Sequence, residues 1–401
     1  MLRSLFSGVS GLRAHQTMLD VVGNNIANVN TTGFKSSSVE FQDTLSQQLK
    51  AAGAPQGAQA GTNPAQVGLG VQVAAVNTAF TQGPAETTGV STDLMIQGDG
   101  FFIVNDGGQQ VYTRDGAFSF DTNGNLTTAN GAMVQGWTAT GGTVNTSGTV
   151  GGIKLPLGTS MAPTKTDSAV LAGNLPADGS GDPPTNDLKV YDQKGQMVDV
   201  TLSYTYDTAT KVWSLNYNDP SIVPPATQPA ATALAFNADG TLSTTSPVSV
   251  TLNGQTVALD ISGITSYGGA NTTEVVSSTG NAMGSLASYS ISPDGTIEGV
   301  FTNGMKQPLG QIALATFNNP GGLNKVGNSE YSESVNSGQA QIGAAGTGSR
   351  GQLAAGELEG SNVDLSQEFS NLIIAERGFE ANSKVITTSD EVLQDLVNLK
   401  H

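Results

Sequence analysis

Apolar residues recur at helical spacing near the start of the chain. Between residues 2 and 28 they follow one another by steps of three and four, and Gln16 and Gly23 occupy the two missing positions of the repeat. This stripe predicts an amphipathic helix about 40 Å long with a heptad-like seam. The stretch from Asn28 to Gly33 supplies residues that end a helix. The predicted seam consists of Leu2, Leu5, Val9, Leu12, Leu19 and Ile26.

A second helical stripe occupies the other end of the chain. Asp364 can accept hydrogen bonds from the first free backbone N–H groups of a helix, and Gln367 completes a start similar to a capping box. Glu376, Ser383 and Asp390 interrupt the apolar seam of this helix, which would be about 54 Å long. Neither helix carries enough apolar surface to be stable alone, so each needs a partner face, on its own domain or on another subunit. The C-terminal seam consists of Leu365, Phe369, Leu372, Phe379, Ile386, Leu393 and Val397.

The residues between these stripes show the patterns of strands and turns. Asn123-Gly124, Asp239-Gly240 and Asp294-Gly295 each stand between apolar residues, which is a strong signal for a tight β-hairpin. Alternating residues at 198–206 and 248–252 predict half-buried strands. We therefore expect a mainly β protein, built of antiparallel sandwich or barrel domains, with long N- and C-terminal helices that form a coiled-coil layer.

Glycine-rich segments indicate a nested domain organisation. Residues 51–66 are almost all Ala, Gly, Gln, Pro and Asn, which predicts a flexible linker or an extended loop. Further glycine-rich stretches separate a first β unit from a second and precede the last helix. The expected parts are a helical domain (1–30 with 363–401), a connector with an extended loop (31–66 with 346–362), an inner β domain (67–145 with 284–345) and an inserted outer β domain (146–283).

Composition and charge exclude several classes of function. Only 12% of the 401 residues are charged, and the net charge is −17. A protein this acidic is a poor match for phosphate groups, which argues against nucleic-acid binding. The absence of cysteine excludes disulfides and thiolate chemistry. The sequence contains neither an 18-residue apolar run nor the apolar segment of a cleavable signal peptide, so membrane insertion and signal-peptide export are not expected.

The sequence also lacks convincing catalytic or ligand-binding motifs. His15 and His401 have no second metal ligand at a suitable spacing. Residues 346–351 match the glycine pattern of dinucleotide sites but lack its strand–helix setting. Residues 121–125 resemble part of a calcium loop, but the glycine comes too early and the closing glutamate is missing. We therefore expect no catalytic, cofactor or metal residues, and no enzyme.

Longer motifs resemble one known family. Residues 21–35, with the sequence Val-Val-Gly-Asn-Asn-Ile-Ala-Asn-Val-Asn-Thr-Thr-Gly-Phe-Lys, closely resemble the N-terminal signature of the bacterial flagellar axial proteins, the rod and hook subunits. Residues 358–366 and 382–388 resemble the closing motif of that family. Two segments between 113 and 126 resemble its inner β domain, and 309–317 resembles a segment of hook proteins. The motif residues are Asn24, Asn25, Ile26, Ala27, Asn28, Gly33 and Phe34.

The resemblance implies a structural role in the bacterial flagellum. It implies terminal helices that line a central channel as a coiled coil, and β domains that form the wall of a flexible tube. That tube would act as a universal joint between motor and filament. The implied partners are further copies of the chain, the rod, hook-cap and hook–filament junction proteins, and the flagellar type III export apparatus. The implied location is extracellular, in the hook, without a cleaved signal peptide.

Two alternatives remain open. Chain length favours a hook subunit, but residues 47–66 resemble the extra loop of the distal rod subunit. The alternative from a different class is a secreted β-sandwich adhesin or carbohydrate-binding module, which would bind through exposed aromatic residues. Only Trp137 and Trp213 are available as tryptophans, and neither lies in an aromatic cluster of the sequence. Tubes in electron micrographs would favour the flagellar role, and a persistent monomer with sugar affinity would favour the adhesin.

Overall fold

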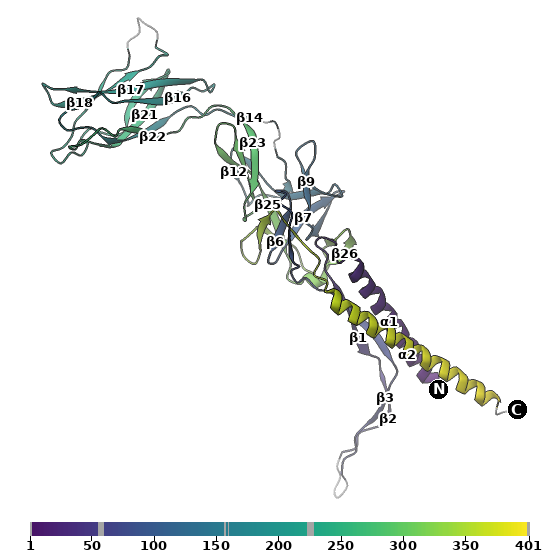
Figure 1. Cartoon of the computed structure of the whole chain (residues 1–401). Coiled ribbons are helices and arrows are strands. Elements are labelled where there is room, and N and C mark those ends of the chain that lie inside the picture. Colours follow the sequence, from purple (N-terminus) through teal and green to yellow (C-terminus); the bar gives the residue numbers. More distant parts are fainter. Residues whose placement is uncertain (1, 55–59, 156–157, 159, 223–227, 399–401) are drawn as a thin grey trace. The chain divides into compact units, whose positions relative to one another are not determined.

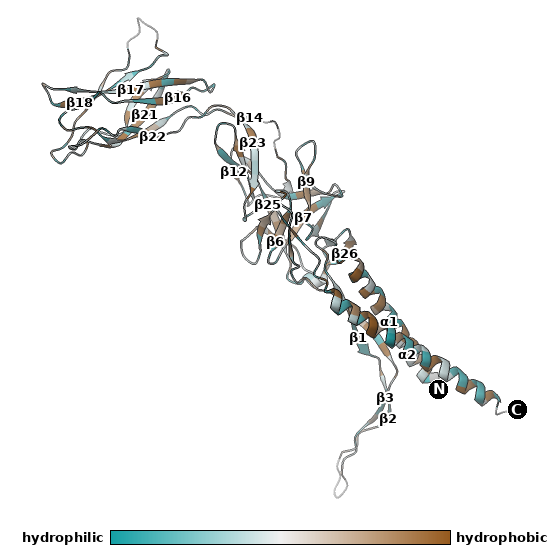
Figure 2. Cartoon of the chain, in the orientation of Figure 1, coloured by the Kyte–Doolittle hydropathy of each residue, from teal (hydrophilic) through white to brown (hydrophobic). Residues whose placement is uncertain are grey.

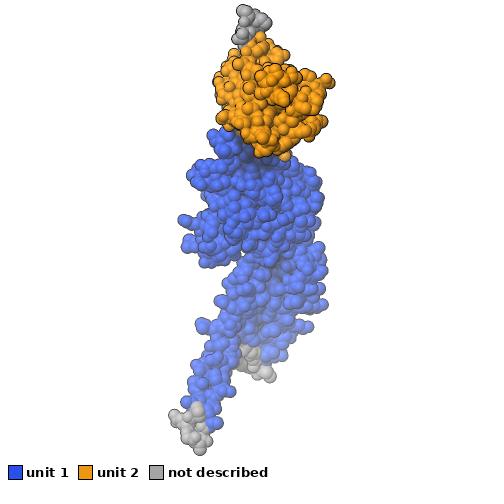
Figure 3. Space-filling view, turned by 90° about the vertical axis from the view of Figure 1, so that its left-hand side faces the viewer, with its two compact units in different colours: residues 1–156, 290–298, 308–401 blue, residues 157–289, 299–307 orange. Residues whose placement is uncertain are grey.

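The computed structural model describes residues 2–54, 60–155, 158, 160–222 and 228–398. The chain forms two compact units, shown in Figure 3. Unit 1 comprises Met1–Pro156, Ser290–Glu298 and Pro308–His401, and unit 2 comprises Leu157–Tyr289 and Gly299–Gln307. Strands dominate both units, and the two long helices lie at the chain ends. The expected fold class, mainly β with long terminal helices, is confirmed.

The terminal helices begin and end close to the predicted positions (Figure 1). Helix α1 covers Leu2–Ala27, and helix α2 covers Leu365–Asn398. Asn28 closes α1 because its backbone N–H and its side chain both donate to the carbonyl of Asn24. The Asp364 carboxylate accepts hydrogen bonds from the N–H groups of Ser366 and Gln367, as the sequence predicts for the start of α2.

Unit 1 contains four two-stranded antiparallel sheets, two of which join early and late parts of the chain. β1 (Ser37–Asp43) pairs with β4 (Val71–Thr78), and β2 (Ser46–Lys50) pairs with β3 (Ala65–Gly68). β5 (Ala85–Thr87) pairs with β30 (Glu357–Glu359), and β6 (Leu94–Gln97) pairs with β29 (Gln352–Ala355). The expected linker at 51–66 is therefore partly a hairpin, which a bridge between Gly53 and Thr62 continues beyond β2 and β3. Residues 55–59 lie outside the described part.

The main sheet of unit 1 contains strands in the order β25-β11-β7-β8-β27-β26. Aromatic side chains fill its core, among them Phe101, Tyr112, Trp137, Phe317 and Tyr331. The predicted Asn123-Gly124 turn connects β9 to β10, and Gly124 has a φ of +82°. The strands and short helix are β7 (Phe101–Asp106), β8 (Gln109–Thr113), β9 (Phe118–Phe120), β10 (Leu126–Thr128), β11 (Met133–Thr140), β12 (Thr143–Val144), β13 (Gly151–Gly152), β25 (Lys306–Thr316), η1 (Pro320–Gly322), β26 (Asn324–Gly327), β27 (Glu330–Ser332) and β28 (Gln341–Ala344).

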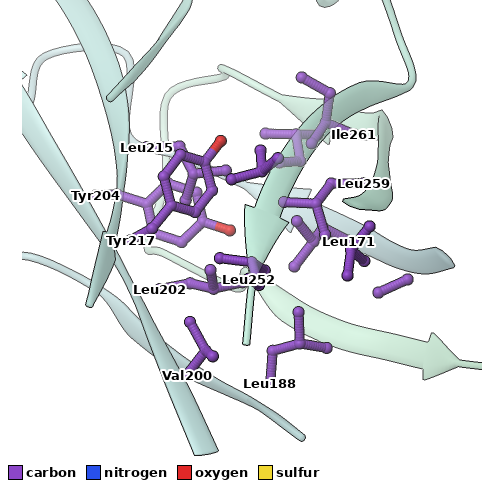
Figure 4. Close-up of a cluster of buried hydrophobic side chains, with 14 of the residues drawn as sticks. Leu171, Leu188, Val200, Leu202, Tyr204, Leu215, Tyr217, Leu252, Leu259 and Ile261 are labelled. Atoms are coloured by element: carbon purple, nitrogen blue, oxygen red, sulfur yellow. The ribbon is translucent and has the colours of Figure 1, made fainter. Parts of the chain in front are cut away.

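Unit 2 contains two four-stranded sheets around a shared apolar core. Leu171 and Leu259 from one sheet and Leu202, Tyr204 and Leu215 from the other are among its buried residues (Figure 4). The pair β15–β21 is parallel, whereas the sequence predicts antiparallel sheets. The sheets are β20 (Val248–Leu252), β21 (Gln255–Thr265), β15 (Ser168–Asn174) and β22 (Glu274–Ser278); and β16 (Thr185–Tyr191), β17 (Met197–Asp207), β18 (Val212–Asn218) and β19 (Thr232–Leu234).

The borders of unit 2 differ from those of the expected insertion at 146–283. Residues 146–156 belong to unit 1, where β13 pairs with β11 and the side chains of Ile153 and Leu155 are buried. Residues 284–289 and 299–307 belong to unit 2. The chain crosses between the units near β14 (Ser160–Met161), β23 (Gly284–Ile291) and β24 (Thr296–Phe301). The glycine-rich segments at 141–152 therefore lie before the border and not on it.

Candidate assembly surface and the junction beneath it

Helices α1 and α2 pack against each other through small residues. Gly8 lies against Ile386, His15 lies against Gly378, and Asn25 contacts Glu368, so the two helices run antiparallel. A Cβ atom at Gly378 would stand 2.4 Å from Cε1 of His15. Glycine therefore permits the close approach of the two helix backbones at this point, because any side chain would displace the imidazole ring.

The predicted N-terminal seam lies beside the buried row of α1. Leu5, Leu12, Leu19 and Ile26 are half-buried, Val9 is exposed, and the side chain of Leu2 is outside the described part. The fully buried positions lie mostly one residue earlier in each turn. They are Gly8, Gly11, Ala14, Val22 and Asn25. Apolar periodicity missed this row because most of its members are small or polar, and they serve close packing instead of hydrophobic burial.

The predicted C-terminal seam is divided between the buried and the exposed surface of α2. Leu372, Ile386 and Leu393 are half-buried against the rest of the chain. Four other predicted residues are exposed, namely Leu365, Phe369, Phe379 and Val397. In the described part of α2, the fully buried side chains are those of Glu368 and Ala375. The seam therefore offers more apolar surface than this chain covers by itself.

Sequence reasoning missed a second exposed apolar row on α2. Ile374, Ala381, Val385 and Val392 are all exposed, and their spacing of seven, four and seven residues places them on one side of a helix. This row and the predicted seam flank the buried stripe on opposite sides, and Phe6 of α1 is also 71% exposed. Figure 2 shows apolar segments along both helices. A search of the sequence for a second set of apolar residues at heptad spacing would have revealed this row.

Beneath the helices, a buried ionic junction joins three distant segments. Nζ of Lys35 donates to Oε1 of Glu359 at 2.7 Å and to the carbonyl of Thr81 at 2.7 Å. Nη1 of Arg114 lies 3.3 Å from Oε2 of Glu359, and the N–H of Gly83 also donates to this carboxylate. Lys35, Arg114 and Glu359 are all at least 97% buried at their side chains. The junction therefore links the N-terminal motif, the inner β domain and the closing motif.

Burial controls the electrostatics of this junction. It lowers the pKa of the Lys35 ammonium group, and the hydrogen bond and charge of Glu359 oppose that effect. Burial likewise lowers the pKa of Arg114, again against the attraction of Glu359. The carboxylate of Glu359 is thus the shared counter-ion of two cations that would otherwise be buried without compensation.

The family motif residues position the helices on the junction. The side-chain amide of Asn25 bonds to both backbone groups of Ser37, and its Nδ2 lies 3.2 Å from Oε1 of Glu368 on α2. Gly33 has a φ of +66°, and a Cβ there would stand 2.5 Å from the backbone nitrogen of Asp115. Asn24 and Ala27 are exposed, whereas Ile26, Asn28 and Phe34 are half-buried.

Models of four protein families match successive parts of the chain. They are "Flagella basal body rod protein" at 5–35, "Flagellar hook protein FlgE/F/G D1 domain" at 95–167, "Flagellar basal body protein FlaE D2 domain" at 176–281 and "Flagellar basal body rod FlgEFG protein C-terminal" at 354–399. The flagellar hook protein FlgE of Borreliella burgdorferi is 37% identical, with all of both chains covered. FlgE of Salmonella typhimurium is 36% identical over 99% of this chain and 100% of its own. The chain belongs to the flagellar hook protein FlgE family.

The chain is also similar to a flagellar rod protein and to a solved hook-protein structure. The flagellar basal-body rod protein FlgG of Bacillus subtilis is 32% identical over the full length of both chains. The crystal structure of Helicobacter pylori flagellar hook protein FlgE2 covers 68% of this chain and 100% of its own with a TM-score of 0.53. At 13% identity that match supports the fold alone.

The described residues of this FlgE-family chain contain no group of three potential metal ligands, and no described helix is both long and apolar enough to cross a membrane. The ring of His15 lies at the α1–α2 interface, 5.8 Å from the ring of Phe41 between centroids. His401 is outside the described residues. The Asp121 loop is a hairpin turn whose carboxylate accepts the N–H groups of Asn123 and Asn125.

Proposed function

We propose that this chain is the subunit of the bacterial flagellar hook and polymerises with copies of itself into a helical tube. The observation that carries the proposal is its similarity to FlgE hook proteins over the whole of both chains. The helix pair supports it, because apolar residues remain exposed on both sides of the buried stripe of α2. Surfaces of this kind mark contacts with other protein chains.

Within the tube, the helices of many copies form the coiled-coil layer around the channel, and the β units form the wall. The seams on α1 and α2 are covered by neighbouring copies. The tube acts as a universal joint that passes motor torque to the filament. A wall with few charges and many neutral polar groups suits this task, because water-bridged contacts exchange at lower cost than dry apolar ones.

Further partners follow from a place in the hook. The chain would contact the rod at one end of the tube, the hook-filament junction proteins at the other, and the hook cap during growth. It would leave the cell through the flagellar type III export apparatus and act outside the cell. We assign it no catalytic step and no cofactor.

Electron microscopy of the purified protein under polymerising conditions tests the proposal directly. Short tubes with a central channel are expected from the full chain. A protein that remains monomeric under every condition that polymerises other hook proteins would contradict it, and sugar affinity of that monomer would favour an adhesin.

A distal rod subunit is a second candidate that two observations favour. Leu49 and Val67 of the β2–β3 hairpin are exposed, as is Leu45 just before it, and the match to a FlgG rod protein spans both chains. Expression in bacteria that lack either the hook protein or the distal rod protein separates the two roles. Restored motility in the hook-deficient strain alone supports the hook, and restored motility in the rod-deficient strain alone supports the rod. Deletion of 47–66 should then destabilise whichever assembly forms.

A further inference from the structure

Helix α1 presents two cations that have no ion-pair partner among the described residues. Arg3 and Arg13 are exposed, and the ion pairs of the described chain all involve other residues. Phe6 and Val9 lie between them in the sequence and are exposed as well. This combination of apolar and basic surface is notable in a chain with a net charge of −17.

In the C-terminal half of α2, exposed acidic residues outnumber the single exposed lysine, Lys384. Glu380, Asp390, Glu391 and Asp395 are exposed, and the last three have no cation partner among the described residues. Glu380 lies 2.9 Å from Arg377, but both side chains are at least 66% exposed. A pair this exposed contributes little and exchanges readily for another partner.

The basic residues of α1 and the acidic residues of α2 have the same spacing along their helices, and they lie at similar heights along the helix pair. Arg3 and Arg13 are ten residues apart, as are Glu380 and Asp390, which corresponds to about 15 Å along each helix. The contacts of His15 with Gly378 and of Asn25 with Glu368 define the antiparallel register. In that register Arg3 lies at about the level of Asp390, and Arg13 at about the level of Glu380. Within the described part of one chain, no ion pair joins these side chains.

We propose that α1 of one copy packs antiparallel against α2 of a second copy, with Arg3 opposite Asp390 and Arg13 opposite Glu380. The inference rests on the proposed self-assembly and names the contact that carries it. The exposed Phe6 and Val9 are covered in the same contact. In the proposed contact, α1 of each copy packs on α2 of one neighbour, and its α2 packs on α1 of another neighbour. Such an interface is heterologous, and heterologous interfaces build closed rings or open helical assemblies. The opposite charges also offset the long-range repulsion between acidic copies.

A charge-exchange experiment tests this contact in the full-length chain. One variant carries Arg3→Glu and Arg13→Glu, a second carries Glu380→Arg and Asp390→Arg, and a third combines all four substitutions. The matched control, Lys154→Glu with Lys189→Glu, changes the net charge as the first variant does, at exposed lysines outside the helices. The critical concentration for tube formation is measured by sedimentation at low salt.

We expect each two-site variant to raise the critical concentration by about tenfold, and the four-site variant to restore it to within about threefold of the unchanged chain. The control should stay within about twofold of it. Raised ionic strength should reduce the difference between the variants. If the four-site variant assembles no better than the two-site variants, or if all variants assemble alike, the contact is wrong while self-assembly stands. If the unchanged chain forms no tubes, self-assembly itself is wrong.

Discussion

At the scale of single residues, Glu359 has the most consequential position in unit 1. Its carboxylate accepts hydrogen bonds from Lys35, Gly83 and Arg114, and its backbone carbonyl accepts the N–H of Gly33. Residues from three parts of the chain that are far apart in sequence therefore depend on one side chain. Removal of one partner from a buried ion pair lowers the free energy of unfolding by more than the intact pair contributes to it. The reason is that the remaining charge stays buried without a counter-ion.

Glu359→Gln should lower the free energy of unfolding of unit 1 by about 3–5 kcal/mol, because the cations of Lys35 and Arg114 stay buried without a counter-ion. Urea unfolding followed by the fluorescence of Trp137, in a Trp213→Phe background, measures the change. Glu357→Gln is the matched control, since this side chain is only half-buried and makes no ion pair in the described chain. Equal midpoints for the two variants would contradict the role of the junction.

Gly33→Ala should destabilise unit 1 for two reasons, the positive φ and the clash with the backbone of Asp115. Gly107→Ala separates them, because Gly107 has a φ of +56° but a Cβ added there would meet no atom within 4 Å. We expect a loss of about 1–2 kcal/mol for Gly107→Ala and about 1–3 kcal/mol more for Gly33→Ala. The same urea titration gives both values, and a loss at Gly33 no greater than at Gly107 would exclude the close contact.

At the scale of elements, the helix pair is held together by shape more than by hydrophobic burial. Gly8, Gly11 and Gly378 permit the close approach, and after Ala375 no described side chain of α2 is fully buried. The helices are consequently marginal in one chain and depend on further contacts for their stability.

Gly378→Ala should lower the melting temperature of assembled tubes, because the new Cβ displaces the ring of His15 and separates the helices. Gly23→Ala is the matched control on α1, where a Cβ meets nothing within 4 Å. It should leave the melting temperature unchanged or raise it, since alanine favours a helix over glycine by about 1 kcal/mol. Differential scanning calorimetry of the tubes measures the melting temperature of both variants. If Gly23→Ala lowered it as much as Gly378→Ala, the close contact between the helices would not explain the effect.

The C-terminal half of α2 should be cut rapidly by protease in the dilute monomer and protected in tubes, because its stability comes from neighbouring copies. Brief proteolysis followed by mass spectrometry locates the cuts.

Leu393→Asp should prevent tube formation while the melting temperature of unit 2 stays unchanged. Protection of residues 376–398 in the monomer would contradict this dependence on assembly.

At the scale of the whole molecule, unit 2 has a hydrophobic core of its own. We therefore expect it to unfold in acid independently of unit 1. Hydrogen bonds from hydroxyl and backbone N–H groups lower the pKa of four aspartates of this unit. Three of them are exposed at or near turns, namely Asp178, Asp207 and Asp239, and the fourth, Asp260, is half-buried in β21. A carboxylate whose pKa is lower in the folded state contributes stability above its unfolded pKa, and that contribution disappears as the pH falls through the folded pKa.

The melting temperature of unit 2 should therefore be nearly constant above about pH 5 and fall below about pH 4. Fluorescence of Trp213 in a Trp137→Phe background reports on this unit alone. Asp239→Asn should reduce the acid dependence, because the amide oxygen can still accept the hydrogen bonds from Thr241 but does not titrate. A melting temperature that rises on acidification would contradict the direction of these pKa shifts.

Local patterns predicted the elements of this protein well. The heptad stripe of α1, the Asp364 cap of α2 and the Asn123-Gly124 hairpin all depend on residues within a few positions of one another, and the structure contains all three. The flagellar family was also recognisable, because its motifs are continuous in the sequence. The linker expected at 51–66 was less predictable, because its small polar residues allow both a loop and the paired strands of the β2–β3 hairpin.

The sequence by itself determined the two terminal helices, the strand-rich part between them, the acidic charge and the family, since these depend on composition and short-range order. Only the tertiary structure decided which row of α1 is buried, because glycine and alanine carry no hydrophobic signal but permit the closest packing. It alone brought Lys35, Arg114 and Glu359 together across more than 200 residues and placed β15 parallel to β21. Such pairings are contacts between residues that are far apart in the sequence. They depend on the path of the whole chain, which no local pattern of residues predicts.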